Sequence, residues 1–464
     1  MNARITSLIA VLSLTCAVAF GQLSNLTSAN ATSADPAPHA VNEVSMIVTP
    51  TYNLQTGSMV DTVYAAYMRY PAQQDGPYSN NVSVGTVGGT WTLKPPPPPQ
   101  RPSGADFPAG TFTGDPVLAT NPSDGELHPH RVYLASTTIY GTENQISLWT
   151  LDAANPGANW VYRQSFDYFS AGPINDKPAI NVSQATSTFG HAYAVYLRSG
   201  KVHFWRNTAG ETWTDKGIIY PGPFDPQSNT LGGTRVDVDN EFGSVFVSFL
   251  DLTANKVYVL QSDDEGNTWT KYSAPTYCAD DPQCNTCQLL TNNDGNVIKG
   301  DTSSVYSPTQ LHTFWAYRML ELVYHQRKLD GTGSEVVMRT FYHPTHIWYP
   351  VHKVSSQDST HDSWQGAVTC HNSGVCAVAF YDHASGDSSS AYRIYNRVLN
   401  VDGTPLRGPL NDVLLYPNAS DATRFFIRRM EYHDFFLLNN FWYTADVFTS
   451  GNGSADVLVT RQTW

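Results

Sequence analysis

The sequence predicts an all-β protein that folds as a β-propeller of seven four-stranded antiparallel blades, with six blades as the alternative. Two observations predict this class. The chain of 464 residues is rich in aromatic residues, Thr, Ser, Gly and Pro, which favour strands and turns, and only 14% of it is charged. Turns that end in Trp also recur at intervals of about 55 residues, which suits a four-stranded blade with moderate loops.

The first residues indicate export. Arg4 precedes an uncharged apolar run from Ile5 to Ala19, and Ala19-Phe20-Gly21 is a small-x-small exit. This run is too short for a membrane span, and we expect no span later in the chain. The expected division is a signal peptide over 1–21, a disordered lead-in over 22–42 and a propeller over 43–464. The expected location is extracellular, or periplasmic in a bacterium.

The charge balance limits the partners. The net charge is −13, and an acidic surface repels phosphate backbones, so a nucleic-acid partner is not expected. An anionic ligand would need a local group of Arg or Lys to overcome this field. No pattern indicates a cofactor, and the sequence does not specify an oligomeric state.

The cysteines suit an oxidising compartment. Cys16 leaves with the signal peptide, and Cys370 and Cys376 flank a short hairpin tip across which a disulfide is expected. A second group in a turn-rich segment contains Cys278, Cys284 and Cys287. A disulfide pair with one leftover thiol is the simpler interpretation of this group. A metal site is the alternative, but zinc usually takes four ligands and no His lies close by, so no metal is expected.

One turn is specified residue by residue. The segment from Ser262 to Trp269 reads S-x-D-x-G-x-T-W, the pattern of an Asp-box. In such a turn we expect Asp264 to accept hydrogen bonds from the backbone of its own turn. Gly266 permits a positive φ, Thr268 completes the pattern, and Trp269 folds back as an apolar plug at the start of the next strand. This role is structural and reports the fold.

Weaker copies of this turn and the later strands complete the repeat. Partial turns end at Trp91, Trp160 and Trp213. The later blades lack the turn motif but keep a strand pattern over 311–324, 335–342, 366–370, 375–381, 393–399, 435–438, 442–447 and 456–461. Counted from Glu43, these strands give seven blades.

With these turns and strands in order, the chain resembles the sialidase-like (BNR / Asp-box repeat) propellers of secreted proteins. Short segments that look like the family's inner strands support the resemblance. They are Asn42–Val48, Gly114–Ala119, Asp176–Ile180 and Val378–Asp382. The resemblance covers most of the chain after residue 42 and implies a carbohydrate-acting protein.

A propeller binds ligands where its innermost strands begin. The candidate residues at these places are Asp115, Asp176, Arg235, His361, Asp362, Glu431 and Tyr432. Each also has a structural interpretation. Asp115 and Asp176 could make Asx turns, Arg235 could form a structural ion pair, and His361 and Asp362 could be ordinary loop residues.

The family implies specific roles for these residues. Sialidases hold a substrate carboxylate with three Arg and use a Tyr nucleophile helped by Glu, with an Asp as acid/base. On this basis the catalytic candidates are Asp176, Asp362, Glu431 and Tyr432. The substrate-binding candidates are Arg235, Asp115 and His361, with Arg235 as the guanidinium for an acidic sugar. The family's early Arg-Ile-Pro signature is missing here, and no arginine triad is assigned.

The sequence is therefore compatible with three functions. The first is a secreted glycoside hydrolase-like enzyme acting on carbohydrate. The second is a non-catalytic propeller that binds glycans through exposed aromatic residues. The third is a polysaccharide lyase acting on uronate-containing glycans, for which the histidine-rich segment 342–352 has suitable residue types in an outer strand and loop.

Overall fold

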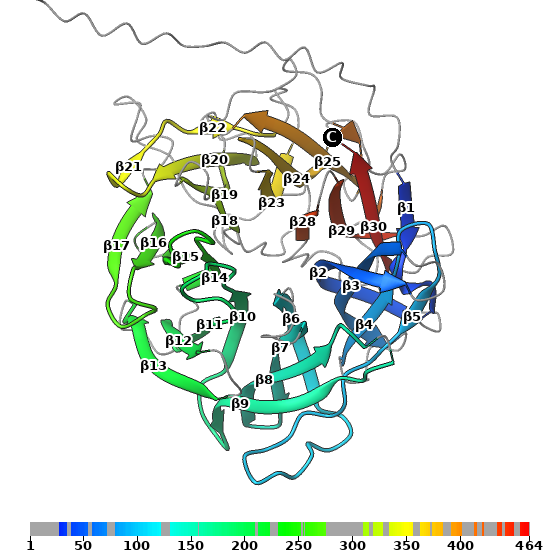
Figure 1. Ribbon diagram of the computed structural model, residues 1–464. Coiled ribbons are helices and arrows are strands. Elements are labelled where there is room, and N and C mark those ends of the chain that lie inside the picture. Colours follow the sequence, from blue (N-terminus) through cyan, green and yellow to red (C-terminus); the bar gives the residue numbers. More distant parts are fainter. Residues whose placement is uncertain are drawn as a thin grey trace, which may run out of the picture.

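The structure is a computed structural model, and it describes the following residues: 27–34, 39–53, 58–71, 79–121, 130–155, 157–208, 212–222, 231–251, 254, 256–274, 310–314, 319–327, 334–355, 362–371, 374–383, 391–400, 413–414, 420–421, 434–438, 441–449 and 455–463. These residues form seven antiparallel sheets arranged as blades around a common axis (Figure 1). The prediction of seven four-stranded blades is therefore confirmed.

Blades one to four follow one another along the chain, and each runs from its innermost to its outermost strand in sequence order. Blade one contains β2 (His39–Asn53), β3 (Ser58–Pro71), β4 (Ser79–Gly85) and β5 (Trp91–Leu93). Blade two contains β6 (Phe112–Asn121), β7 (Arg131–Tyr140), β8 (Glu143–Asp152) and β9 (Val161–Phe169). Blade three contains β10 (Asn175–Val182), β11 (Ala192–Arg198), β12 (Lys201–Asn207) and β13 (Trp213–Tyr220). Blade four contains β14 (Leu231–Val238), β15 (Val245–Asp251), β16 (Lys256–Ser262) and β17 (Thr270–Ala274).

The last three blades are less regular at their outer edges. Blade five contains β18 (Gln310–Phe314), β19 (Met319–Arg327) and β20 (Ser334–Tyr342), with β21 (Ile347–Trp348) and β22 (His352–Lys353) both on β20. Blade six contains β23 (Asp362–His371), β24 (Val375–His383) and β25 (Ala391–Asn400), with β26 (Val413–Leu414) and β27 (Ser420–Asp421) both on β25. Blade seven contains β28 (Asp434–Leu438), β29 (Phe441–Thr449), β30 (Ala455–Thr463) and β1 (Thr27–Asn30).

The hydrophobic core lies between the blades. Each turn Trp of blades one to four stands at the beginning of the outermost strand and packs into a cluster shared with a neighbouring blade. Trp213, for example, meets Phe166 of blade two with ring centroids 5.1 Å apart. The Trp repeat seen in the sequence is thus a repeat of inter-blade contacts, because a sheet buries its apolar face only against another layer.

The ring is closed by the N-terminal strand. β1 pairs with β30, so blade seven combines the two ends of the chain (Figure 1). Thr32, in the 3-10 helix η1 (Ala31–Ala34), donates a hydrogen bond from its hydroxyl to Asp456 Oδ1 over 2.7 Å. This finding corrects the expected disordered lead-in over 22–42, because β1 forms there and β2 already begins at His39. Across the described residues η1 is the one helical segment, and no helix has the length and apolarity that a bilayer crossing needs.

The closure makes Thr32→Val a test of the fold. The substitution should lower the free energy of unfolding by about 2 kcal/mol, because it removes the Thr32 hydroxyl that donates to the buried Asp456 carboxylate. Urea denaturation of both proteins measures the difference. The matched control is Thr92→Val on the exposed side of β5, for which we expect a change within about 0.5 kcal/mol. Equal effects of the two substitutions would show that Thr32 does not hold the closure.

Candidate functional site

The innermost strands of blades one to four carry the same irregularity. β2, β6, β10 and β14 each contain a register shift against the second strand of the blade, near the first residues of the strand. The bulged residue is left-handed in every case: φ is 52° at Glu43, 49° at Asp115, 52° at Lys177 and 59° at Gly233. A positive φ costs a residue with a side chain roughly 1–3 kcal/mol, so such residues cluster at functional sites.

The bulged residues of neighbouring blades contact one another. Asp115 donates its backbone N–H to Glu43 Oε2 over 2.9 Å. The Asp115 carboxylate in turn pairs with Lys177 Nζ, 2.8 Å from Oδ1. The carbonyl oxygen of Lys177 accepts the Thr234 hydroxyl over 2.5 Å. Blades one to four are therefore linked at one level around the axis.

Glu43, Asp115, Asp176 and Lys177 form a carboxyl–lysine cluster at these bulges. Asp176 is half-buried and the other three are buried, and the pKa values of the carboxyls differ. Burial raises the pKa of Glu43 to about 8 and that of Asp176 to about 7. Burial also opposes ionisation of Asp115, but the Lys177 ammonium and hydrogen bonds from Asp176, Lys177 and Thr137 outweigh it, so the pKa of Asp115 is lowered. The interaction between the two side chains lowers the pKa of Asp115 and raises that of Asp176. The arrangement therefore places Asp176, which retains its proton up to about pH 7, near an ionised Asp115 that Lys177 neutralises.

The structure places the other predicted site residues as follows. Arg235 lies half-buried on β14, two positions after Gly233 and opposite Ser248 in register. Asp362 begins β23, the inner strand of blade six, opposite His383. His361, Glu431 and Tyr432 lie outside the described residues. The residues that the structure brings together are Asp115 and Asp176.

Sequence reasoning missed Glu43 and Lys177. From the sequence, Asp115 and Asp176 were given the same place on their strands. In the structure, the residue of β10 that corresponds to Asp115 of β6 is Lys177, because both lie at the register shift. The signal was present in the sequence, because Asp115 and Lys177 each directly precede a Pro. The expected Asx-turn alternative is not seen at Asp115, whose carboxylate contacts Lys177 and the Thr137 hydroxyl. Asp176 Oδ1 accepts the N–H of the adjacent Lys177 instead.

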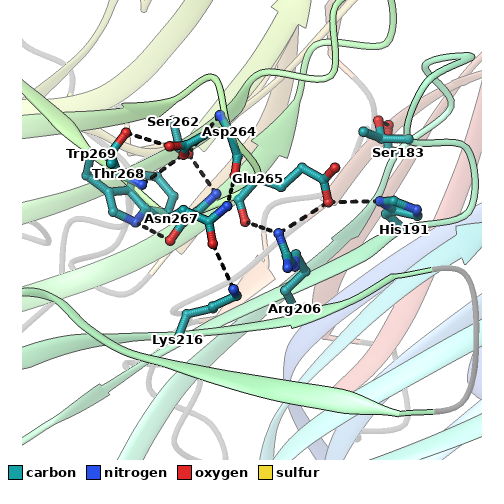
Figure 2. A network of polar contacts seen from close by, with 12 residues as sticks. Ser183, His191, Arg206, Lys216, Ser262, Asp264, Glu265, Asn267, Thr268 and Trp269 are labelled. Carbon is teal, nitrogen blue, oxygen red and sulfur yellow. Dashed lines mark hydrogen bonds and ion pairs between the residues drawn. The ribbon is translucent and has the colours of Figure 1, made fainter.

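The turn from Ser262 to Trp269 is held by side chains, as Figure 2 shows. Asp264 Oδ1 accepts the backbone N–H of Thr268 over 2.8 Å, and Oδ2 accepts the Thr268 hydroxyl over 2.7 Å. Ser262 donates its hydroxyl to Asp264 Oδ1 and accepts the N–H of Gly266. These bonds, with the Thr268 backbone bond foremost, lower the pKa of Asp264. The expectation that Asp264 accepts backbone hydrogen bonds within its turn is confirmed.

The same turn docks onto blade three. Gly266 has a φ of 85°, and a Cβ there would lie 2.1 Å from the ring of Phe204, so both backbone and space require glycine. Glu265 Oε2 lies 3.0 Å from His191 Nδ1 and 3.4 Å from Arg206 Nη1 (Figure 2). Trp269 packs against Phe204 with ring centroids 5.0 Å apart. The turn therefore joins two blades at the rim, far along the sheet from the bulges.

The cysteines and the possible metal site were also considered from the sequence. Cys370 and Cys376 face each other across β23 and β24 and form a disulfide with an S–S length of 2.08 Å, which confirms that pairing. The cysteines at 278, 284 and 287 lie outside the described residues. Within the described ranges no group of three or more His, Cys, Asp and Glu side chains is placed to hold a metal ion.

The histidine-rich segment is used in packing. His343 is buried, and its Nε2 lies 3.1 Å from Asp239 Oδ2 of blade four. His346 stacks on Phe341, with centroids 6.2 Å apart, and also contacts Tyr272. These two histidines therefore serve the contact between blades four and five.

A surface hollow lies at the other end of blade two. It has a volume of about 420 Å³, and its lining includes Arg131, Asp152 and Arg163. Arg131 pairs with Asn121, the last residue of β6, whereas the bulge at Asp115 is near the beginning of that strand. The hollow is therefore separate from the carboxyl–lysine cluster.

Comparison with known proteins gives similarities of fold. No protein-family model matches the chain, and no curated protein matches it. Among solved structures, a protein of unknown function from Dyadobacter fermentans is 13% identical with a TM-score of 0.44, over 92% of this chain and 95% of that one. Trypanosoma rangeli sialidase in complex with the inhibitor DANA is 10% identical with a TM-score of 0.40, and the match covers 91% of this chain but 55% of the sialidase. An α-L-arabinanase from Penicillium chrysogenum is 11% identical with a TM-score of 0.36, over 61% of this chain and 92% of the enzyme. At these identities and TM-scores the likeness assigns no activity to this chain.

The turn analysis predicts the effect of Asp264→Ala. The variant should lose about 1 kcal/mol of unfolding free energy, because the Thr268 N–H and hydroxyl lose their acceptor at a partly solvated site. Chemical denaturation measures this loss. Activity or ligand binding of the folded variant should stay near the wild-type level, since the turn lies at the rim. A folded Asp264→Ala protein that has lost function would assign the turn a functional role.

Proposed function

We propose that the protein acts on carbohydrate and that it hydrolyses a glycosidic bond at the carboxyl–lysine cluster of the inner strands. One observation carries the proposal. Asp176 and Asp115 lie side by side with pKa values shifted in opposite directions, upward for Asp176 and downward for Asp115. Paired carboxyls whose environments separate their protonation states are the arrangement that acid–base catalysis of glycoside cleavage requires.

In this proposal Asp176 is the acid/base residue. It is half-buried, and its pKa, raised to about 7, leaves a large fraction of the carboxyl protonated at neutral pH, so it can give a proton to the leaving oxygen. Asp115 is held ionised by Lys177 and is 5% exposed, so its carboxylate is engaged in this buried ion pair. In this proposal the attacking group comes from another blade. Asp362 of blade six and the predicted Glu431 and Tyr432 are the proposed sources, with Arg235 and His361 as contacts for an acidic sugar.

A second candidate function is glycan binding without cleavage. The burial of the cluster favours it, because the exposed fractions of Glu43, Asp115 and Lys177 are 6%, 5% and 8%. Groups so enclosed can hold a binding surface in shape without meeting the ligand. Turnover measurements separate the two functions.

Export and the family resemblance belong to the same proposal. The disulfide between Cys370 and Cys376 supports an oxidising location outside the cytoplasm. The hydrogen bonds of the turn at Ser262–Trp269 support its interpretation as an Asp-box of the sialidase-like propellers. A carbohydrate partner is consistent with both.

The test of the proposed function is Asp176→Asn against a panel of sialosides, uronate polymers and neutral glycans. The variant should lose about 10²- to 10⁴-fold in kcat on the substrate that wild type cleaves, because an amide cannot donate the proton. Wild-type activity should fall as the pH rises through about 7, since the protonated form of Asp176 is then lost. The matched control is Asp237→Asn, an inner-strand carboxyl bonded to Asn181, which should keep wild-type turnover.

The panel also decides between the functions. Binding without cleavage by wild type would select the glycan-binding alternative. Neither binding nor cleavage of any member would contradict the carbohydrate proposal. Full turnover by Asp176→Asn on a real substrate would remove Asp176 from the reaction.

A further inference from the structure

Glu43 lies one blade away from the Asp115–Asp176 pair, yet it contacts Asp115 directly. It sits at the bulge of β2 with a φ of 52° and is 6% exposed. Its Oε2 accepts the backbone N–H of Asp115 over 2.9 Å, which crosses from blade one to blade two. This contact fixes the main chain of Asp115 and leaves the Asp115 carboxylate for Lys177 and Asp176.

The contact with Glu43 supplies an acceptor for a backbone N–H that the bulge leaves unpaired in the sheet. In the pairing of β6 with β7, Gly114 is opposite Thr137 and Val117 is opposite Ala135, so Asp115 has no partner in the ladder. A buried N–H without an acceptor costs free energy comparable to a lost hydrogen bond. A carboxyl oxygen from the neighbouring blade supplies that acceptor.

The side chain of Asp115 depends on this backbone position. Its φ of 49° turns the carboxylate toward blade three, where Oδ1 meets Lys177 Nζ at 2.8 Å and Oδ2 accepts the Thr137 hydroxyl at 3.2 Å. An ordinary extended residue at the same place would aim its side chain differently, because a bulge re-orients the side chains of its strand.

We propose that Glu43 is a positioning residue, which holds Asp115 in its left-handed conformation so that the Asp115 carboxylate meets Lys177 and Asp176. The catalytic consequence rests on the proposed function. The positioning itself is a statement about the conformation of Asp115 and does not depend on turnover.

The charge of Glu43 fits this role. Burial, followed by repulsion from Asp115, raises its pKa to about 8, while Lys177 lowers it and Asp176 raises it further. Glu43 is therefore protonated at neutral pH and leaves Lys177 to Asp115. A glutamine has nearly the same shape, carries no charge and keeps a carbonyl oxygen as acceptor, so it should replace Glu43 in positioning.

The experiment compares Glu43→Gln and Glu43→Ala with a matched control. Ser45→Ala, on the same strand, removes the acceptor of the Leu118 N–H, another inter-blade bond of 3.0 Å between β2 and β6 that does not touch the bulge. Crystal structures of the three variants report the φ of residue 115 and the distance between Asp115 and Lys177. Unfolding as a function of pH and, where a substrate is known, the pH–rate profile are measured in parallel.

The expected results differ among the variants. Glu43→Gln and Ser45→Ala should keep the conformation of Asp115, and Glu43→Gln should keep turnover within about threefold of wild type. Glu43→Ala should release Asp115 from Lys177, lower kcat at least about tenfold and shift the pH–rate profile. The folded state of wild type retains a proton that the unfolded chain releases near 4.5, so its stability falls as the pH rises from about 5 to 8, and the Tm of Glu43→Gln relative to wild type should rise over that range.

Two results would overturn the inference. One is a Glu43→Ala structure in which Asp115 keeps its φ and its contact with Lys177. The other is a loss of turnover in Glu43→Gln as large as in Glu43→Ala, which would give Glu43 a chemical role of its own. If wild type neither binds nor cleaves any glycan, the proposed function fails, while the structures still decide the positioning.

Discussion

The site depends on the ion pair between Asp115 and Lys177. The two groups are 2.8 Å apart, buried, and contributed by neighbouring blades. Removing one partner of a buried pair leaves an uncompensated charge, which is strongly destabilising, so the rest of the cluster is constrained by this contact. Lys177 keeps Asp115 ionised, and the negative charge of Asp115 in turn helps Asp176 to retain its proton.

The pair exists because the inner strands are irregular at the same level. Each bulge shifts the register by one step and presents its residue to the next blade around the axis. The outer strands are joined differently. Their turn Trp residues pack between blades, and Glu265 of the Ser262–Trp269 turn contacts His191 and Arg206 of blade three. The blades are thus joined at two levels, by turn residues at the rim and by the bulged residues of the inner strands.

The sequence predicted the repeated blades. It did not predict the bulges of the inner strands or the pairing of strands from the two ends of the chain. The spacing of Trp160, Trp213 and Trp269 predicted the blades because blades two, three and four each pack a turn Trp into a cluster shared with a neighbouring blade. Asp115 and Asp176 were found as polar residues at the starts of inner strands. Glu43 and Lys177 were missed because a bulge displaces the pairing by one residue, and no periodic pattern records that shift. The closure by β1 was missed because its partner β30 lies at the other end of the chain, so no local pattern indicates it.

The most direct test of the account is a double-mutant cycle on the free energy of unfolding with Asp115→Asn and Lys177→Met. Each single variant should be destabilised, because each removes one half of a buried ion pair and leaves the charge of the other half less well compensated. The account predicts that the double variant is more stable than the sum of the two losses implies, with a coupling energy of about 1–3 kcal/mol. Losses that add to within about 0.5 kcal/mol would contradict it, because the bulges of blades two and three would then carry independent residues.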